Sequence, residues 1–292
     1  MNLQELFPRF SPSRMLSNQV LLIVGQELKQ LISQSIEGCR VFILVCSGKI
    51  NLSIDSRSYN MEENDFMDVL EGVPIHFKSC SDDLHAYCLF PNYKFARNSL
   101  KLFRPGPENY FLERTKFPIL HLTEEEAHRI QQQMVLLKES LESLQHYYRN
   151  DLVQTYFRSF MLEEGNLMFS RANAMTAGNT LIINKKDILL MNFMKLIWEN
   201  AITEHGVAFY ADNLCVSTKH LTRLTKEAFK QTPHEMICKE IIYHALDMLD
   251  NHEISIQQIS EELNFADMAS FSKFFKKHMQ VSPVAYRQLH LS

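Results

Sequence analysis

The chain has 292 residues, of which 46% are hydrophobic and 22% charged, and its formal net charge is −4. This length and balance fit about two folded domains and exclude a disordered or collagen-like chain. The eight glycines never stand closer together than ten residues, so the glycine-rich loops G-x-G-x-x-G and G-x-x-x-x-G-K that hold nucleotide phosphates are absent.

The apolar segments of the chain are short. The longest run without a polar residue, Val41–Cys46, has six residues, whereas a membrane-spanning helix needs about 20. Residues 1–5, Met-Asn-Leu-Gln-Glu, do not resemble the start of a signal segment. The six cysteines form no C-x-x-C pair, and four stand in strand-like apolar stretches, which favours buried thiols over disulfides or a zinc site. We therefore expect a cytoplasmic chain that spans no membrane.

Residues 40–91 show the period of two that is typical of β-strands. The candidate strands are Val41–Val45, Ile50–Ile54, Phe66–Leu70, Ile75–Lys78 and Leu84–Phe90. Turn-prone residues separate them, a spacing that predicts an antiparallel barrel or sandwich.

The same window gives little support to an enzyme. His76 and His85 are its only histidines and have no metal-binding spacing, whereas a metal-dependent oxygenase needs two histidines and a carboxylate around one cavity. No nucleophile elbow or basic neighbourhood of a cysteine is present. We expect no enzymatic activity, no metal and no cofactor.

Two long helices are predicted after this region. Thr123, with Glu126 three residues later, forms the pattern of a capping box. The apolar positions that follow are spaced 4, 3, 4, 3 and 4 residues apart, the rhythm of a helix–helix seam: Ile130, Met134, Leu137, Leu141, Leu144 and Tyr148. A second helix is expected at about Asp151–Phe169. The seam either packs on the chain's own strands or forms a dimer interface, and its regularity favours the dimer.

Residues 171–184 show neither the apolar period of a helix nor that of a strand, and they carry few charges, which predicts a linker. From Lys185 to Ser292 the pattern is helical, and an internal repeat lies within it. Five positions are repeated after 49 residues: Val207, Tyr210, Ala211, Leu214 and Val216 correspond to Ile256, Ile259, Ser260, Leu263 and Phe265. Six more are repeated after 50 residues: Leu221, Arg223, Leu224, Lys226, Thr232 and Pro233 correspond to Phe271, Lys273, Phe274, Lys276, Ser282 and Pro283.

Each copy of the repeat is predicted to form a short helix, a tight turn and a second helix. Ala211 and Ser260 are small enough for a close helix crossing, and Ser217 and Asp267 are good N-caps for the second helices. This is the pattern of a helix-turn-helix unit, whose second helix can enter the major groove of DNA. A hairpin used only for packing is the alternative.

Charge favours DNA over that alternative. Lys219, Arg223, Lys226 and Lys230 are spaced as one outward strip of the first copy. Lys273, Lys276 and Lys277 give the second copy a similar excess of positive charge. Between the copies, a helix that begins at Pro233 is long enough to hold two recognition helices about one DNA turn (~34 Å) apart.

On these residues the chain resembles the AraC family of transcription regulators. The stretches that carry the resemblance are Ala211–Phe229 (ADNLCVSTKHLTRLTKEAF) and, more specifically, Ile256–Arg287 (IQQISEELNFADMASFSKFFKKHMQVSPVAYR). The family usually has an aromatic residue where Thr225 stands and arginine where Ile241 stands. It usually has glycine at the positions of Lys230, Asn264 and Gln280. Asparagine adopts the left-handed conformation more easily than lysine or glutamine, so we expect the first unit to be less tightly packed.

The resemblance implies base-facing residues in both second helices: Thr218, Lys219, Thr222 and Arg223 in the first, and Met268, Ala269, Ser272 and Lys273 in the second. Arginine and lysine can donate to guanine, whereas Met268 and Ala269 offer only apolar contact, for instance to a thymine methyl. Lys226, Lys230, Lys276 and Lys277 are predicted to hold phosphates.

The resemblance also implies the organisation of the whole chain. The expected fold is α+β with several domains: a cupin-like antiparallel β-barrel sensor over residues 1–122, a helical dimerisation region over 123–170, a linker over 171–184 and an all-α double helix-turn-helix domain over 185–292. His76 and Tyr87 are the predicted polar anchors of a small-molecule effector. Expected partners are double-stranded DNA, a second copy of the chain and RNA polymerase. A domain that only dimerises, and helical hairpins that bind protein instead of DNA, remain alternatives.

Overall fold

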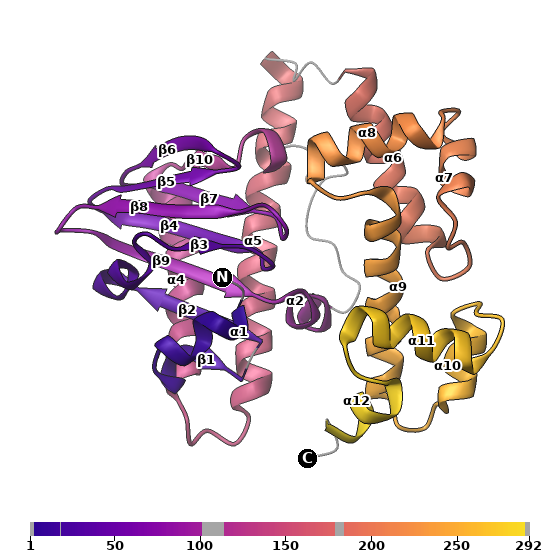
Figure 1. Ribbon diagram of the computed structural model, residues 1–292. Helices are drawn as coiled ribbons and strands as arrows, with labels where there is room; N and C mark the ends of the chain where they lie inside the picture. The colour runs from indigo at the N-terminus through magenta and orange to yellow at the C-terminus, as the bar shows by residue number, and fades with distance from the viewer. Residues whose placement is uncertain (1–2, 18, 101–113, 179–183, 290–292) are drawn as a thin grey trace. The chain divides into compact units, whose positions relative to one another are not determined.

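The computed structural model describes residues 3–17, 19–100, 114–178 and 184–289. The chain divides into two compact units, residues 1–182 and 183–292 (Figure 1). The first contains antiparallel sheets and helices, and in the second the described elements are all helical. The predicted α+β fold class is confirmed.

Two antiparallel sheets form the centre of the first unit. The larger has the strand order β1-β2-β9-β4-β7-β10, from Met15–Leu16, Val20–Val24, His85–Pro91, Val41–Ser47, Asp65–Val69 and Ile119–His121. The smaller has the order β3-β8-β5-β6, from Ser35–Ile36, Ile75–Cys80, Ile50–Ile54 and Arg57–Met61. The hydrogen-bonded pairs of the described strands stay within one sheet or the other, so the expected barrel is open and resembles a sandwich.

The turn at Gly48 carries the chain from one sheet to the other, between β4 and β5. Gly48 has φ +76°, and a Cβ atom there would lie 2.6 Å from the Ser81 hydroxyl and 2.7 Å from Leu84 Cα. Only glycine fits this turn without moving its neighbours. The close approach explains why the strand pattern breaks at this residue.

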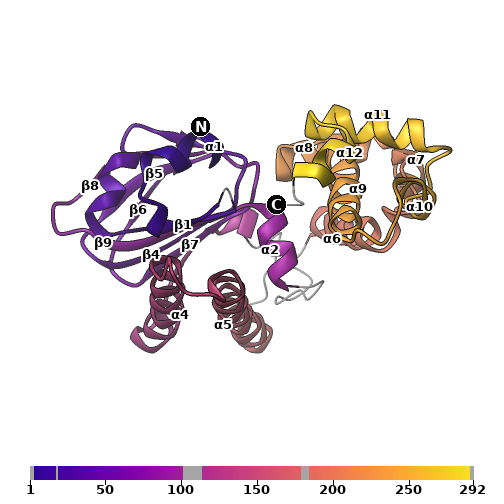
Figure 2. The same cartoon turned by 90° about the horizontal axis from the view of Figure 1, so that it is seen from below.

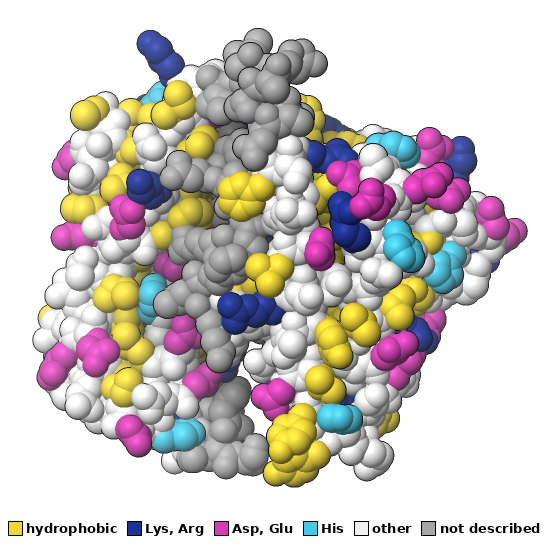
Figure 3. All heavy atoms as spheres, turned by 180° about the vertical axis from the view of Figure 1, so that it is seen from behind, with side chains coloured by type: hydrophobic (Ala, Val, Ile, Leu, Met, Phe, Trp, Pro, Cys, Tyr) yellow, Lys and Arg dark blue, Asp and Glu magenta, His cyan; other side chains and the backbone are white. Residues whose placement is uncertain are grey.

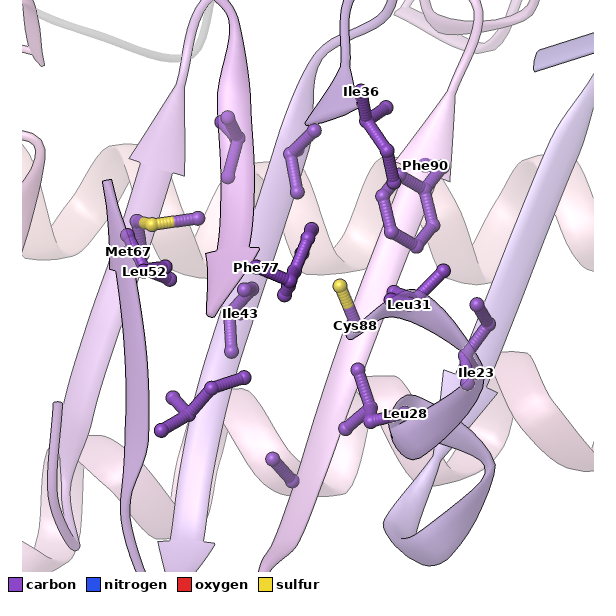
Figure 4. Close-up of a cluster of buried hydrophobic side chains, with 14 of the residues drawn as sticks. Ile23, Leu28, Leu31, Ile36, Ile43, Leu52, Met67, Phe77, Cys88 and Phe90 are labelled. Carbon is purple, nitrogen blue, oxygen red and sulfur yellow. The ribbon is translucent and has the colours of Figure 1, made fainter. Parts of the chain in front are cut away.

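The core of the sandwich is filled by apolar side chains from both sheets (Figure 4). Ile43 and Cys88 from the larger sheet meet Leu52 and Phe77 from the smaller one. The 3₁₀ helix η3 (Gly25–Leu31) adds Leu28 and Leu31 to this core.

The opposite face of the larger sheet is covered by two helices, α4 (Glu124–Glu142) and α5 (Arg149–Gly178), which lie side by side along it (Figure 2). Phe42 and Leu44 of β4 point to these helices, whereas Ile43 and Val45 point to the sandwich core. Burial on both faces explains the unbroken apolar run in this strand, because alternation disappears when neither face is wet.

The capping box of α4 is confirmed: Glu126 N donates to the Thr123 hydroxyl, and Thr123 N donates to the Glu126 carboxylate. The prediction that the α4 seam forms a dimer interface is wrong for its first four residues. Ile130, Met134, Leu137 and Leu141 are buried against the chain's own sheet and α5. A 4-3 rhythm shows that a helix has a narrow apolar stripe, but α5 of the same chain meets that stripe.

The predicted linker is wrong in its first part. Residues 171–178 continue α5 to Gly178, and residues 179–183 lie outside the described residues. The stretch has three alanines and a methionine among these eight positions, and both residue types favour helix. Their helix propensity extends α5 although the amphipathic pattern has ended.

Further described elements of the first unit are short and include α1 (Leu3–Leu6), η1 (Phe7–Arg9), η2 (Pro12–Arg14) and α2 (Tyr93–Leu100). Phe95 of α2 packs on Phe157 of α5, with ring centroids 4.9 Å apart.

The second unit is built around α9 (Pro233–Asp250). Its other helices are α6 (Lys185–Asn200), α7 (Val207–Asn213), α8 (Thr218–Phe229), α10 (Ile256–Glu262), α11 (Met268–Met279) and α12 (Pro283–Leu289). The first half of α9 packs with α6, α7 and α8 through Ile237 and Ile241. The second half packs with α10, α11 and α12 through Ala245 and Leu249. One helix therefore joins two small cores.

Candidate nucleic-acid interface

The first helix-turn-helix unit consists of α7 and α8. Tyr210 and Ala211 on α7 are buried with Leu221 on α8. In the turn, Leu214 N donates to Tyr210 O at 3.1 Å and Val216 N donates to Ala211 O at 3.0 Å. Cys215 between them adopts the left-handed conformation, with φ 55°.

The second unit, α10 and α11, repeats this turn. Leu263 N donates to Ile259 O at 3.0 Å, and Phe265 N donates to Ser260 O at 2.9 Å. Asn264 has φ 55°. Each of these residues stands 49 positions after its counterpart in the first unit, so the repeat in the sequence is a repeat of backbone geometry.

Both predicted N-caps are confirmed. The Ser217 hydroxyl accepts from His220 N at 3.1 Å, and the Asp267 carboxylate accepts from Ser270 N at 2.6 Å. The hydrogen bond from Ser270 N lowers the pKa of Asp267. A charged cap thus begins α11, where a carboxylate is favoured by the helix dipole.

The predicted base-facing residues lie in equivalent exposed positions on the two second helices. The exposed ones are Thr218, Lys219, Arg223, Met268, Ala269 and Lys273, and the half-buried ones are Thr222 and Ser272. The inward faces of the same helices carry Leu221 and Leu224 on α8, and Phe271 and Phe275 on α11. Each unit therefore presents an exposed face at the start of its second helix, which is polar on α8 and includes the apolar Met268 and Ala269 on α11.

The predicted phosphate-binding lysines are also exposed: Lys226, Lys230, Lys276 and Lys277. Lys230 ends α8 as its C-cap with φ 59°, and Gln280 ends α11 in the same way with φ 62°. Both adopt the left-handed conformation despite having a Cβ atom, which costs about 1–2 kcal/mol relative to glycine.

Two contacts of α8 were not expected from the sequence. Arg223 Nη2 lies 3.4 Å from His220 Nδ1, which accepts when it is unprotonated. Lys186 of α6 forms an ion pair with Glu227 at 2.6 Å, and this hydrogen bond lowers the pKa of Glu227. The i, i+3 spacing of His220 and Arg223 was a local signal, whereas the pair between α6 and α8 depends on tertiary structure.

The connecting helix begins where the sequence predicts it, with Pro233 as its first residue and a capping box between Thr232 and Glu235. Its 18 residues correspond to about 27 Å at 1.5 Å per residue. At its end, Arg287 Nε of α12 donates to Leu249 O at 3.2 Å.

The two predicted effector anchors are not brought together. Tyr87 of β9 is buried with the side chains that face α4 and α5, and this burial raises its pKa. His76 of β8 stands between Ile75 and Phe77, which both point into the sandwich core, so His76 points to the outer side of the smaller sheet. Strand alternation turns both side chains away from the sandwich core and to different sides of it, so they do not face one cavity, and a ligand contact by either residue stays a prediction.

In the described part of the chain, no group of three or more His, Cys, Asp or Glu side chains is arranged to hold a metal ion. None of the helices in the described ranges is both long and apolar enough to span a bilayer. All six cysteines are free; Cys39, Cys88 and Cys238 are buried and Cys215 is exposed.

Comparison with known proteins matches the family described as "Helix-turn-helix domain" to residues 210–289. Histidine kinase P4 of Formosa agariphila is 29% identical over 120 residues, 41% of this chain and 9% of its own length. The lactose operon transcription activator of Staphylococcus xylosus is 28% identical over 106 residues, 36% of this chain and 37% of its own length. The xylose operon regulatory protein of Haemophilus influenzae is 29% identical over 101 residues, 35% of this chain and 26% of its own length.

The alignments therefore span well under two thirds of each of these relatives. A solved structure of ToxT from Vibrio cholerae is 16% identical, covers 94% of this chain and 99% of its own, and has a TM-score of 0.37. The segment matched by the family contains α8, α9, α10 and α11 together with both turns. Residues 210–289 are thus a helix-turn-helix domain of the AraC family of transcription regulators.

Proposed function

We propose that the chain is a sequence-specific DNA-binding regulator of transcription. The observation that carries the proposal is the repeated geometry of the two units, which have the same turn hydrogen bonds and expose equivalent positions of α8 and α11. A basic strip on one helix alone is often merely solvated. Two such strips on two copies of one helix-turn-helix unit fit insertion into successive major grooves.

The two helices divide the reading of bases unequally in this proposal. Arg223 and Lys219 of α8 donate to guanine O6 and N7, while Met268 and Ala269 of α11 make apolar contact. Thr218, Thr222, Ser272 and Lys273 complete the base-facing set. Lys226, Lys230, Lys276 and Lys277 hold phosphates and set the position of the domain on the duplex.

The chain acts as a homodimer in this proposal. Although the seam of α4 is used within the chain, hydrophobic side chains remain exposed at the turn between α4 and α5: Leu144 is 50% exposed, Tyr147 90% and Tyr148 60%. Figure 3, which shows the protein from behind, has a group of hydrophobic side chains at its lower edge. Exposed apolar groups of this kind are typical of interaction surfaces.

The remaining parts of the proposal concern the first unit and the cell. The sandwich acts as the sensor of a small-molecule effector, α4 and α5 form the dimerisation region, and the second unit binds DNA and contacts RNA polymerase. The chain works in the cytoplasm and catalyses no reaction. Since His76 and Tyr87 face different sides of the sandwich, only one of them can anchor the effector.

The decisive experiment measures binding of the full chain to duplexes that carry each single base change within an operator selected from a random pool. Arg223→Ala is expected to lose discrimination at one or two positions, at a cost of about 1–3 kcal/mol. Lys276→Ala is expected to weaken all duplexes equally. Uniform weakening by both variants would contradict the division of labour, and absence of duplex binding at low salt would favour protein-binding hairpins.

A further inference from the structure

The turn of the second helix-turn-helix unit touches the segment that leads into the first. Asn264 Nδ2 donates to the carbonyl oxygen of Thr203 at 2.7 Å, across 61 residues of sequence. Thr203 lies between α6 and α7. The hydrogen bond therefore joins the turn between α10 and α11 to the N-terminal side of the other unit.

Aromatic and aliphatic packing follows the same route. The rings of His205 and Phe265 lie 4.8 Å apart. Phe265 and Phe274 each pack against the apolar cores of both units, and Ile202 packs against the core of the second. The two units thus share side chains beyond the helix α9 that links them.

The backbone of Asn264 explains why an amide side chain can stand here. Its φ of 55° lies in the left-handed region, which asparagine enters more easily than most residues. Glycine, usual at this position in the family that the sequence resembles, would form the turn equally well. It has no side chain, however, so it cannot donate to Thr203.

We propose that Asn264 is a positioning residue that fixes the two helix-turn-helix units of one chain relative to each other. It thereby sets the spacing that the chain accepts between its two half-sites on DNA, where a half-site is the stretch of duplex that one helix-turn-helix unit contacts. This inference rests on the proposed binding of DNA by both units. One inserted base pair moves a half-site by about 3.4 Å and turns it by roughly 35° around the duplex. The second helix-turn-helix unit has to follow that movement. The hydrogen bond of 2.7 Å between Asn264 and Thr203 breaks when the two residues separate so far.

The test uses the full chain and duplexes in which the two half-sites of a selected operator stand at the preferred spacing or are moved by one or two base pairs. Asn264→Gly keeps the left-handed turn and removes the donor. Asn264→Asp keeps the shape of the side chain and also removes the donor. We expect both variants to bind the preferred spacing nearly as tightly as the parent, while the penalty for one inserted base pair falls by about 2- to 10-fold.

Cys215→Gly provides the matched control, because Cys215 occupies the equivalent turn position of the first unit with the same φ of 55°. It relieves the same backbone strain without touching the hydrogen bond to Thr203. We expect its spacing profile to equal that of the parent.

Two outcomes would overturn the inference: a spacing profile unchanged in both Asn264 variants, or one that Cys215→Gly broadens equally. The proposed function fails separately, if the parent chain itself does not bind the selected operator in preference to a scrambled duplex. Thermal unfolding of each variant shows whether it is folded. If Asn264→Gly does not fold, the spacing profile of Asn264→Asp alone tests the inference.

Discussion

Two residues with long side chains end the recognition helices in a conformation that glycine prefers. Lys230 and Gln280 have φ 59° and 62°, and each donates its backbone N–H to the carbonyl four residues earlier, Lys226 O or Lys276 O. This hydrogen bond closes the helix end and offsets part of the backbone strain. The cost of the Cβ atom remains, so the two helices are less stable than they would be with glycine at these positions.

Lys230→Gly is therefore expected to raise the free energy of unfolding of residues 183–292 by about 0.5–1 kcal/mol. The relief of about 1–2 kcal/mol of backbone strain exceeds the cost of the extra conformational entropy that glycine gives the unfolded chain. Urea unfolding followed by the fluorescence of Trp198, the single tryptophan, measures this change. Lys230→Ala is the control, since it removes the same charge and keeps the strain. Equal stability of the glycine and alanine variants would show that the left-handed cap costs nothing.

A buried group of charges lies between the larger sheet and α5. Arg40 donates twice to the Asp68 carboxylate, with both distances 2.8 Å, and its guanidinium lies 4.5 Å from the centre of the Phe42 ring. Glu164 of α5 is fully buried close to this pair and to Arg114. Burial, and then the Asp68 charge, raise the pKa of Glu164, while the two arginines oppose the shift.

Because the pKa of Glu164 is higher in the folded chain than its ordinary value of 4.5, the protonated carboxyl is favoured by folding. Its contribution to stability is complete below the ordinary value and is lost as the pH rises through the folded value. Glu164→Gln cannot ionise, so its melting temperature minus that of the parent is expected to increase with pH. Glu163→Gln, whose side chain is 35% exposed, is the control. A difference independent of pH for Glu164→Gln would contradict a raised pKa.

At the scale of helices and strands, local chemistry was predictable and choice of partner was not. The caps at Thr123, Ser217 and Asp267 and the helix start at Pro233 depend on residues within one turn of the helix start, and all of them are present. The predicted base-facing positions come from the resemblance to the AraC family, and the structure places them at equivalent points of α8 and α11. These are features that a short stretch of sequence determines by itself.

Features that depend on distant partners were missed. Strand β6 carries Arg-Ser-Tyr-Asn-Met and, among the described strands, pairs with β5 alone at the end of its sheet, so it shows no apolar alternation. Strand β2, Val20–Val24, is a short apolar run, and such runs do not distinguish strand from helix. The hydrogen bond from Asn264 to Thr203 and the pairing of Lys186 with Glu227 arise only when the chain is folded.

The seam of α4 gives a prediction at this scale. Leu137 is fully buried, whereas Leu144 near the turn is 50% exposed. Leu137→Ala is expected to destabilise the first unit by about 2–5 kcal/mol at any protein concentration, because it leaves a cavity within the chain. Leu144→Gln is expected to leave the melting temperature of the monomer unchanged and to weaken self-association in analytical ultracentrifugation. If dilution of the parent lowered its stability as much as Leu137→Ala does, the apolar seam of α4 would have to lie between two chains.

For the whole molecule, net charge is a poor guide to the partner. The chain carries −4, and residues 185–292 contain 12 basic and 13 acidic residues, a net of −1. The positive charge of the second unit is concentrated on α8 and α11, while Glu253 and Glu262 are exposed elsewhere. We therefore expect modest affinity for non-specific DNA, and a larger share of discrimination from the base-facing residues.

The salt dependence of binding separates the distribution of charge from its sum. Each phosphate contact contributes about −0.9 to the slope of log K against log salt. The double variant Lys276→Ala and Lys277→Ala is expected to make this slope shallower by about 1.8. The double variant Glu253→Gln and Glu262→Gln changes the net charge by the same amount in the opposite direction, but it is expected to leave the slope unchanged because neither carboxylate lies on α8 or α11. Equal and opposite changes of this slope in the two double variants would mean that DNA binding depends on the overall electric field of the protein and not on the lysines of α11.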